Sequence, residues 1–569
     1  GNGHHGTAHW AEHKEISQNF SILKYEPQLW RMGACRPTID GTIVGFEKKG
    51  KDTYALIDTS DVHTLMIAAA GTGKTTFFLE PNIEYCCAAG MSFISTDTKG
   101  DIYRNCGYVA AKRYGYKISV IDLRNPLKSD GFNLLHLVKK YMDEYKNNPL
   151  NISAKAKSER YAKIVADSII AADGDKYGAN TYFYDAAKGL IAALILIIAE
   201  YGNDKECHIV SVLKLMIELL EAKPQKKSQL KSETYFADLI KLLPPEHKAR
   251  WLSGAAINNA DQAALSVIST ALSRLNSLID TETEQILCFN TAIDTETLCK
   301  EKCAVFIVLP EEDRTKYVIA NLIIEQISRE IYHIADENGG HLDKRIMIYF
   351  EEFGTMPPIS GVEAMFSALR SRSVSIVAII QSFAQLEKNY GKQGSEIIVD
   401  NTQLMLFGGF APGSSSAEKL SKDLGKQTIL TGSISKGNGG KNSGHQSQQL
   451  QMTGRELITA DELKCLPKGT FICTKTGMSP FKVQLLFYEK LGIRYDEKLN
   501  AEIKEVKTVY YADRKSISKV IKKQHIDEQE NEMNKEENVS DINELITDYS
   551  LEEDDIFTET PSSKKMIRT

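Results

Sequence analysis

Residues 65–76 read Leu65-Met66-Ile67-Ala68-Ala69-Ala70-Gly71-Thr72-Gly73-Lys74-Thr75-Thr76. The apolar beginning predicts a buried strand, and the small residues after it predict a loop that leads into a helix. Such a loop can close its backbone N–H groups around the β- and γ-phosphates of a nucleotide, while Lys74 adds a positive charge and the Thr75 hydroxyl can bind Mg²⁺. The sequence therefore predicts a site for a nucleoside triphosphate, with phosphate-binding residues Ala70, Gly71, Thr72, Gly73, Lys74, Thr75 and Thr76.

The loop departs at one position from the pattern G-x-x-x-x-G-K-[ST], because Ala68 stands where the first glycine is expected. If that position required a left-handed backbone, alanine would be strained, whereas if it only required a small residue, the loop would keep its shape. A chance occurrence of the pattern in a chain of 569 residues is the alternative. The apolar strand directly before the loop favours the phosphate site.

Composition indicates an ordinary globular chain of two or more domains, with 569 residues and 42% hydrophobic content. The net charge of −6 means that the chain has no overall basic surface. Any contact with nucleic acid would therefore need a local basic patch or a channel formed by assembly. Ten cysteines without a C-x-x-C pair indicate reduced, mostly buried thiols. The longest apolar run, Gly189 to Ala199, is too short to cross a bilayer of about 30 Å and predicts a buried helix. Because residue 1 is glycine and no signal peptide follows, a membrane anchor upstream stays possible.

Apolar runs alternate with helical stretches in the order typical of βαβ units. Their acidic or amide ends would meet at one edge of a mostly parallel sheet, where ligands bind. The sequence therefore predicts an α/β fold with a phosphate loop, in which Asp97, Glu351 and Gln381 lie on the same edge as the loop. The expected strands are the apolar run that begins at residue 65 and leads into the phosphate loop, and the runs 91–97, 117–122, 304–309, 346–350, 375–380 and 404–410.

Between about residues 140 and 300 the apolar period becomes helical, with expected helices at 209–220, 235–243 and 263–279. This predicts an all-helical insertion, either as a separate lobe over the nucleotide edge or as helices that return onto the sheet. The expected organisation is a first part of the nucleotide domain at 1–140, a helical region at 141–300 and a second part of the nucleotide domain at 301–500. A charged, disordered tail would follow at 501–569.

Two segments are expected to lack a packed core. Residues 431–449 are rich in glycine, serine, asparagine and glutamine, which predicts a mobile loop, either a plain linker or a loop that contacts substrate. The tail after residue 513 is first basic and then acidic. Such blocks are usually solvated, and the alternative is an acidic docking segment for a basic partner.

Two adjacent carboxylates, Glu351 and Glu352, end the strand 346–350. This is how an NTPase places one acid on Mg²⁺ and another on the attacking water, so Glu351 is expected to share the metal with Thr75, and Glu352 to act as general base. Aspartate is usual at the first position, so Glu351 must fold back or hold the metal through water. Gln381 could sense the γ-phosphate, and Arg370 could enter the site of a neighbouring subunit in a ring.

Further blocks follow one another along the chain. They read His5-Gly6-Thr7-Ala8-His9-Trp10-Ala11, Phe77-Phe78-Leu79-Glu80-Pro81-Asn82-Ile83, Thr96-Asp97-Thr98-Lys99-Gly100-Asp101, Asp130-Gly131-Phe132-Asn133-Leu134-Leu135, Glu351-Glu352-Phe353, Gln381-Ser382-Phe383-Ala384-Gln385-Leu386 with Tyr390-Gly391, and Gly454-Arg455-Glu456-Leu457 with Asp461-Glu462-Leu463. With the phosphate loop, they resemble the motifs of the type IV secretion coupling proteins, the TraG/TraD-like ATPases of conjugation and effector export. The departures are Ala68 for glycine, His9 for arginine, Thr98 for proline, Glu351 for aspartate, and the lack of a proline in the block 130–135.

The resemblance implies a RecA-like ATPase that uses ATP and Mg²⁺, carries an all-alpha domain and lies on the cytoplasmic face of the membrane. It also places Arg370 at the family's arginine-finger position and implies a hexamer around a channel, with N-terminal transmembrane helices missing from this soluble piece, which could be monomeric by itself. The implied cargo is a relaxase joined to single-stranded DNA, delivered to the channel components of the secretion system. A coupler for protein effectors and a nucleotide-binding scaffold with little turnover are the alternatives.

Overall fold

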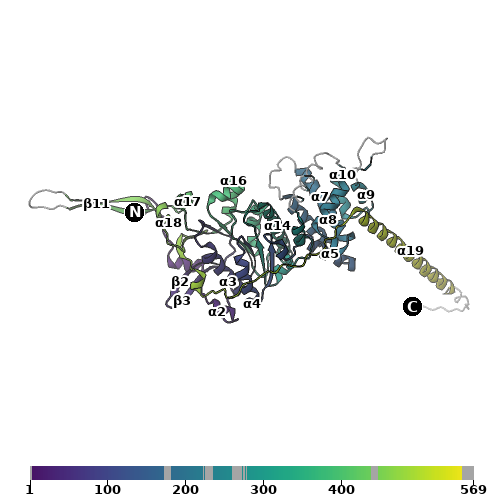
Figure 1. Cartoon of the computed structure of the whole chain (residues 1–569), viewed down its shortest axis with the longest axis horizontal. Coiled ribbons are helices and arrows are strands. Elements are labelled where there is room, and N and C mark those ends of the chain that lie inside the picture. The colour runs from purple at the N-terminus through teal and green to yellow at the C-terminus, as the bar shows by residue number, and fades with distance from the viewer. Residues whose placement is uncertain are drawn as a thin grey trace, which may run out of the picture.

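The computed structural model of the chain describes residues 3–171, 181–221, 223–224, 235–258, 279–436 and 446–553, together with residues 269, 272 and 276. Figure 1 shows a central body built on a sheet, with helices α7, α8, α9 and α10 at one end. A β-hairpin that includes β11 extends from the opposite end, and α19 leaves the helical end as a single rod.

Nine strands form the central sheet in the described part of the chain, in the order β14-β13-β10-β4-β9-β8-β5-β7-β6. The seven from β10 to β6 are parallel, and β13 and β14 add an antiparallel edge. All seven parallel strands were predicted, because runs buried on both faces are continuously apolar. The bounds are β4 Thr64–Ala68, β5 Ser92–Asp97, β6 Lys117–Asp122, β7 Cys303–Val308, β8 Ile346–Phe350, β9 Val374–Ile380, β10 Leu404–Gly408, β13 Thr470–Lys475 and β14 Phe481–Gln484.

The alternation of side chains along each strand divides the interior into two apolar clusters, one on each face of the sheet. In β4, Leu65 and Ile67 join one cluster, and Met66 and Ala68 join the other. The cluster of Met66 is shared with α3 (Glu80–Ala89) and α4 (Tyr108–Tyr114). The cluster of Leu65 is shared with α14 Arg314–Glu337, α15 Val362–Ala368, α16 Phe383–Asp400 and α17 Ser415–Asp423.

A small antiparallel sheet, which was not predicted, precedes the phosphate loop. Its order is β1-β3-β2. Ile43, Val44 and Phe46 of β2 and Trp30 of α2 are buried in the same cluster as Met66, so this sheet is anchored on the nucleotide body. The bounds are α1 His13–Asn19, β1 Ser21–Lys24, α2 Pro27–Arg31, β2 Thr42–Lys49 and β3 Asp52–Asp58.

The described elements between α5 and β7 are all helical, as expected. The apolar run Gly189–Ala199 lies within α7 and is largely buried. The expected helix 209–220 is α8, whereas the expected helix 263–279 lies almost entirely outside the described residues. The bounds are α5 His136–Asn147, α6 Ile152–Ala171, α7 Thr181–Tyr201, α8 Ile209–Leu220, α9 Phe236–Lys241, α10 Lys248–Asn258, α12 Thr281–Leu287 and α13 Thr295–Lys300.

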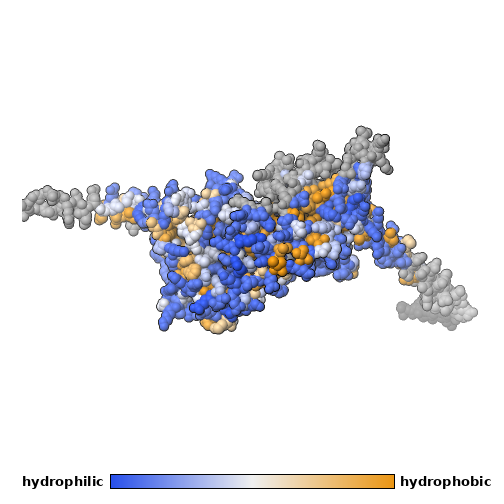
Figure 2. Space-filling view, viewed as in Figure 1, coloured by the Kyte–Doolittle hydropathy of each residue, from blue (hydrophilic) through white to orange (hydrophobic). Residues whose placement is uncertain are grey.

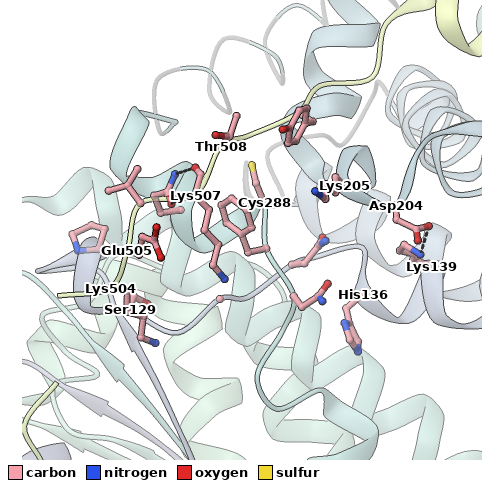
Figure 3. A pocket seen from close by; sticks show the side chains of 18 of the residues that line it. Ser129, His136, Lys139, Asp204, Lys205, Cys288, Lys504, Glu505, Lys507 and Thr508 are labelled. Atoms are coloured by element: carbon pink, nitrogen blue, oxygen red, sulfur yellow. Dashed lines mark hydrogen bonds and ion pairs between the residues drawn. The ribbon is translucent and has the colours of Figure 1, made fainter. Parts of the chain in front are cut away.

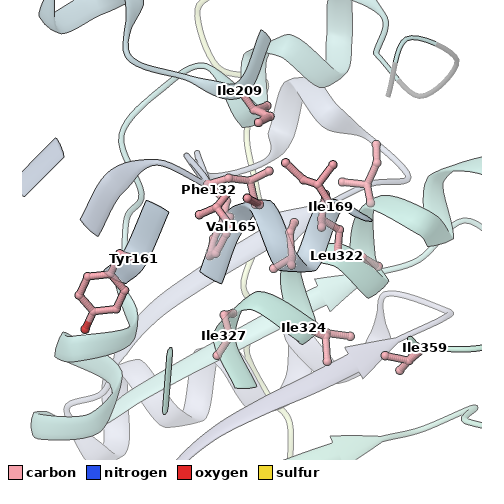
Figure 4. Close-up of a cluster of buried hydrophobic side chains, with 14 of the residues drawn as sticks. Phe132, Tyr161, Val165, Ile169, Ile209, Leu322, Ile324, Ile327 and Ile359 are labelled. Atoms are coloured by element: carbon pink, nitrogen blue, oxygen red, sulfur yellow. The ribbon is translucent and has the colours of Figure 1, made fainter. Parts of the chain in front are cut away.

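The helical region is continuous with the core of the sheet. Figure 4 shows Val165 and Ile169 of α6 beside Leu322, Ile324 and Ile327 of α14, in the cluster that also contains residues of β4. The first helices of this region therefore return onto the sheet's own covering layer. Figure 2 shows a mostly hydrophilic surface, with apolar residues gathered towards the helical end of the body.

The prediction of a mobile loop at 431–449 is wrong for those of its residues that the structure describes. β11 (Lys426–Lys436) and β12 (Gln446–Glu456) pair as an antiparallel hairpin that stands away from the body in Figure 1. Leu430 pairs with Met452, and Gly432 pairs with Leu450. The prediction rested on a composition too polar to form a buried core. Here cross-strand hydrogen bonds satisfy the backbone N–H and carbonyl groups, so the strands form without such a core.

The predicted disordered tail is also wrong, as far as residue 553. Residues 501–513, here called the strap, run across the body, and α19 (Arg514–Glu553) follows. Strap backbone N–H groups donate to Leu127 O (2.9 Å), Gln285 Oε1 (2.9 Å) and Ser211 Oγ (3.0 Å). Ile517 and Ile521 of α19 are buried, so an apolar face anchors the helix. Residues 554–569 lie outside the described residues.

The strap lines one side of a cavity of about 900 Å³ between the sheet's edge and the helical region. Figure 3 shows Lys504, Glu505, Lys507 and Thr508 of the strap around it, with Lys139 bound to Asp204 on the far side.

Short elements complete the described chain. They are α18 Ala460–Lys464, π-helical turns at Lys74–Leu79 and Tyr103–Gly107, and 3₁₀ turns at Pro126–Lys128, Asp204–Glu206, Arg370–Arg372 and Tyr488–Leu491. All ten cysteines are free, and most of them are buried. Within the described residues, no helix has the length and apolarity needed to cross a membrane.

Candidate nucleotide site

The predicted phosphate loop joins β4 to the helical turn that begins at Lys74 and continues into α3. Gly71 has a φ of 75° and Gly73 has a φ of 82°, both in the left-handed region where a side chain is strained. Outside glycine, the described residues with positive φ are Cys35 and Ser373. Ala68 therefore has an ordinary backbone conformation, and the first position of this loop needs only a small residue.

A neighbouring strand end holds the loop in place. The N–H of Ala69 donates to the carbonyl oxygen of Gly409 at 3.0 Å, just beyond β10. The Thr72 hydroxyl donates to Ala69 O at 2.7 Å. Gly409 has a φ of 57°, and an added Cβ there would lie 2.3 Å from Cγ2 of Thr72. Gly409 is thus a residue that shapes the loop and that the sequence analysis missed, although the Gly408-Gly409 pair after an apolar strand was its signal.

Lys74 lies under the loop with its ammonium turned towards the loop's backbone. Its Nζ donates to Ala68 O at 3.2 Å. Burial lowers the pKa of Lys74, while the charges of Glu352 and Glu351 act in the opposite direction. Phosphate oxygens would supply the negative charge that a buried ammonium lacks.

Glu351 brings the two halves of the site together. The Thr75 hydroxyl donates to Oε1 of Glu351 at 3.3 Å. The backbone N–H and hydroxyl of Thr98 donate to Oε2 at 2.9 and 3.2 Å. The extra methylene of glutamate is accommodated, because one carboxylate oxygen faces Thr75 and the other is held by Thr98.

The chemistry of this pair fits a divalent cation. Burial, with the nearby charge of Asp97, raises the pKa of Glu351 to about 7. A carboxylate and a hydroxyl are hard oxygen donors, which suit Mg²⁺. A cation at this point would favour the ionised form of Glu351, which burial disfavours. Thr75 and Glu351 could therefore hold Mg²⁺, and their role as its ligands stays a prediction.

Asp97 lies at the same edge of the sheet, but its carboxylate is occupied by the backbone. It accepts N–H bonds from Gly100 (2.8 Å), Tyr103 (2.9 Å) and Lys99 (3.3 Å). Burial nevertheless raises its pKa. Asp97 therefore shapes the turn that carries Thr98 and Lys99, and this explains why β5 ends in an acid.

Glu352 and Gln381 line one cavity of about 350 Å³ beside the loop. The backbone N–H of Gln381 donates to Oε1 of Gln385 at 2.8 Å, which fixes the start of α16. Lys99 lines the same cavity, and its charge helps to lower the pKa of Lys74. The sequence analysis gave Lys99 no role. The full lining is Thr98, Lys99, Glu311, Tyr317, Glu352, Thr355 and Gln381.

Arg370 does not join this group within one chain. It is exposed, in the turn before β9, whereas the site lies at the carboxyl ends of the strands. At about 3.3 Å per residue, β9 separates the two edges by roughly 20 Å. Arg372 differs from Arg370, because its Nε contacts Oδ1 of Asp336 at 3.1 Å and its guanidinium lies 4.5 Å from the ring of Tyr332.

Comparison with known proteins identifies the fold. The family of type IV secretory system conjugative DNA transfer proteins matches residues 10–524. The bacterial conjugative coupling protein TrwB, in its unbound ΔN70 form, is similar over 88% of this chain and 99% of its own, with 14% identity and a TM-score of 0.53.

Two further TrwB structures are similar over 88% of this chain and 100% of theirs, each with a TM-score of 0.54. They are the complex with the non-hydrolysable ATP analogue ADPNP, at 13% identity, and the complex with ADP and Mg²⁺, at 12% identity. At such identities the likeness establishes the fold, which confirms the expected RecA-like class. No curated protein matches the chain in sequence. With a family match that runs from residue 10 to residue 524, the chain belongs to the type IV secretory system conjugative DNA transfer family.

Proposed function

We propose that the chain is an ATPase that uses ATP and Mg²⁺ to drive the transfer of a relaxase joined to single-stranded DNA into a type IV secretion channel. The observation that carries the proposal is the contact of Thr75 with Glu351, which joins the phosphate loop to the acidic end of β8. Family membership supplies the DNA-transfer context. The TrwB complexes with ADPNP and with ADP and Mg²⁺ support the choice of nucleotide.

Each residue has a defined task in this proposal. The loop from Ala70 to Thr76 holds the phosphates by its backbone N–H groups, and Lys74 supplies positive charge. Thr75 and Glu351 hold Mg²⁺, which would neutralise charge on the phosphates. Glu352 accepts a proton from water, whose oxygen bonds to the γ-phosphorus as the bond to the β–γ bridging oxygen breaks, and ADP and phosphate leave.

Gln381 and Lys99 act at the γ-phosphate side of the site. Both line the cavity that also contains Glu352. The Gln381 amide would report whether the γ-phosphate is present, and Lys99 would add charge to that held by Lys74. Because the turn that carries Lys99 is shaped by Asp97, the second cation is positioned by backbone hydrogen bonds.

Arg370 acts between subunits. Its place at the opposite edge of the sheet separates it from the site of its own chain, so it can serve only a neighbouring copy. The active form would be a homohexamer at the cytoplasmic face of the membrane, anchored by N-terminal segments and joined to components of the secretion channel. The ring itself would form only weakly from the chain without that anchor, so turnover would rise with protein concentration.

The test is steady-state ATP hydrolysis with and without single- and double-stranded DNA, over a range of salt and protein concentrations. We expect Lys74→Ala and Glu352→Gln to abolish turnover, with Lys388→Ala and Glu387→Gln as matched exposed controls. Stimulation by DNA should fall steeply with salt. An ATP hydrolysis rate that does not change when DNA is added would contradict a DNA motor. ATP binding without hydrolysis, at every protein concentration, would contradict the proposed ATPase activity.

A further inference from the structure

α19 carries its charges in two blocks. The first turns contain only cations among their charged residues, and the following turns are almost entirely acidic. We call these the basic block and the acidic block. The basic block is Arg514, Lys515, Lys519, Lys522 and Lys523. The described side chains of the acidic block are Asp527, Glu528, Glu530, Glu532 and Glu536.

The basic block forms one wall of a groove of about 720 Å³ between α19 and α9. Arg514 stacks on Tyr235 at 3.7 Å, while Leu239, Leu242 and Ile526 give the groove an apolar lining. Within the part of the chain that the structure describes, Lys519, Lys522 and Lys523 make no ion pair. Among the described residues, the groove therefore offers several lysines without an ion pair beside Leu242 and Ile526, while Asp238 in the same lining pairs with Lys223 at 2.7 Å.

The acids of the same chain from Glu530 onward lie beyond this groove, whereas Asp527 and Glu528 directly follow Ile526 at its end. α19 is one helix from Arg514 to Glu553 and contains neither glycine nor proline. At 1.5 Å per residue, residues 529–553 of this helix span about 37 Å, and α19 projects away from the body in Figure 1. Side chains from 529 to 536 are exposed, and the ion pair of Glu528 with His525, at 3.9 Å, lies within the helix.

The order of the two blocks also opposes the helix dipole. Cations are favourable near the carboxyl end of a helix and acids near its amino end, and α19 has the reverse arrangement. Without a partner, this order weakens the projecting helix. A second copy of α19 packed antiparallel would place its acidic block along the basic block of the first. Each block would then face charges of the opposite sign.

We propose that the acidic block of a second copy of this chain occupies the groove. The charges of the two surfaces are complementary, and both surfaces belong to the same sequence. Met533 in the acidic block is 65% exposed and lies one turn from Glu530, so the incoming helix presents an apolar side chain and an acid on one face. Met533 would pack against Leu242, which is half-buried, and Ile526, which is exposed, and the acids would face the lysines. This contact does not depend on ATP turnover.

Charge reversal in the full chain tests the proposal, with self-association measured by sedimentation velocity at low and high salt. The groove variant is K519E/K522E/K523E, and the acid variant is E528K/E530K/E532K. Each alone should weaken association about tenfold or more, because like charges then meet. A mixture of the two variants, or all six changes in one chain, should restore it. The matched control is the exposed set K14E/K48E/K51E.

Several results would overturn the proposal. The wild type could remain monomeric at low salt, or both variants could associate as well as the wild type. Folded variants, with wild-type circular dichroism and ATP affinity, could also fail to complement each other. Labelled single-stranded DNA provides the competing occupant. If the groove variant loses DNA binding while self-association is unchanged, the groove binds nucleic acid instead.

Discussion

In the absence of nucleotide, removal of the buried charge of Glu351 should raise the free energy of unfolding of the chain. The increase should be larger at high pH than at low pH. The pKa of this carboxyl is raised from its ordinary value of 4.5 to about 7, mainly by burial. A carboxyl with a higher pKa in the folded chain binds its proton more tightly there than in the unfolded chain. Its contribution to the free energy of unfolding is therefore full below pH 4.5 and is lost as the pH rises through 7.

The size of this loss follows from the two pKa values. Each pKa unit corresponds to about 1.4 kcal/mol, so the ionised carboxylate costs up to about 3 kcal/mol at pH 8 relative to pH 4. Glu351→Gln removes that cost while it keeps the shape of the side chain. We expect the melting temperature of Glu351→Gln to exceed that of the wild type at pH 8 by more than it does at pH 5, in scanning fluorimetry without nucleotide.

Glu330 provides the matched control. Its carboxyl is buried in α14, its pKa is also raised to about 7 by burial, and it accepts bonds from Thr295 (2.6 Å) and Gln326 (2.7 Å). Glu330→Gln should show the same pH-dependent stabilisation. Addition of Mg²⁺ and ATP should stabilise the Glu330→Gln chain as it does the wild type, but should have much less effect on Glu351→Gln. An equal stabilisation of Glu351→Gln at both pH values would refute the reasoning.

Further changes test the loop and the two arginines. Gly409→Ala should weaken ATP binding about tenfold or more, because the added Cβ would displace the phosphate loop, while Gly413→Ala should not; titration calorimetry measures both. Ala68→Gly should leave the ATP hydrolysis rate within about twofold, since this backbone needs no left-handed residue. Arg370→Ala should remove the rise in turnover with protein concentration without changing ATP affinity, whereas Arg372→Ala should lower the melting temperature.

The sheet could be predicted from the sequence because its strands are buried on both faces. In β4, Leu65 to Ala68 pack into two clusters at once, so the run is continuously apolar and stands out from helical periodicity. The site residues Lys74, Thr75, Glu351, Glu352 and Gln381 all follow such runs, and parallel strands bring their ends to one edge.

Other features depend on contacts between distant segments, which no local pattern contains. The bond of Thr98 to Glu351 decides how a glutamate fits where aspartate is usual, and it joins residues from two different strand ends. Arg370 precedes β9, so its edge of the sheet follows from the strand's direction, whereas the neighbouring copy that we propose it serves does not. α19 looked like a solvated tail because its charges dominate the composition, whereas Ile517 and Ile521 decide where it is held.

The strap has a mechanical consequence. One of its backbone hydrogen bonds goes to Leu127, in the loop after β6, and two others go to Gln285 and Ser211 in the helical region. The strap therefore links the edge of the sheet to the helical region by hydrogen bonds. Because α19 begins at Arg514, directly after the strap, the projecting helix starts from a segment that is fixed to both parts of the body.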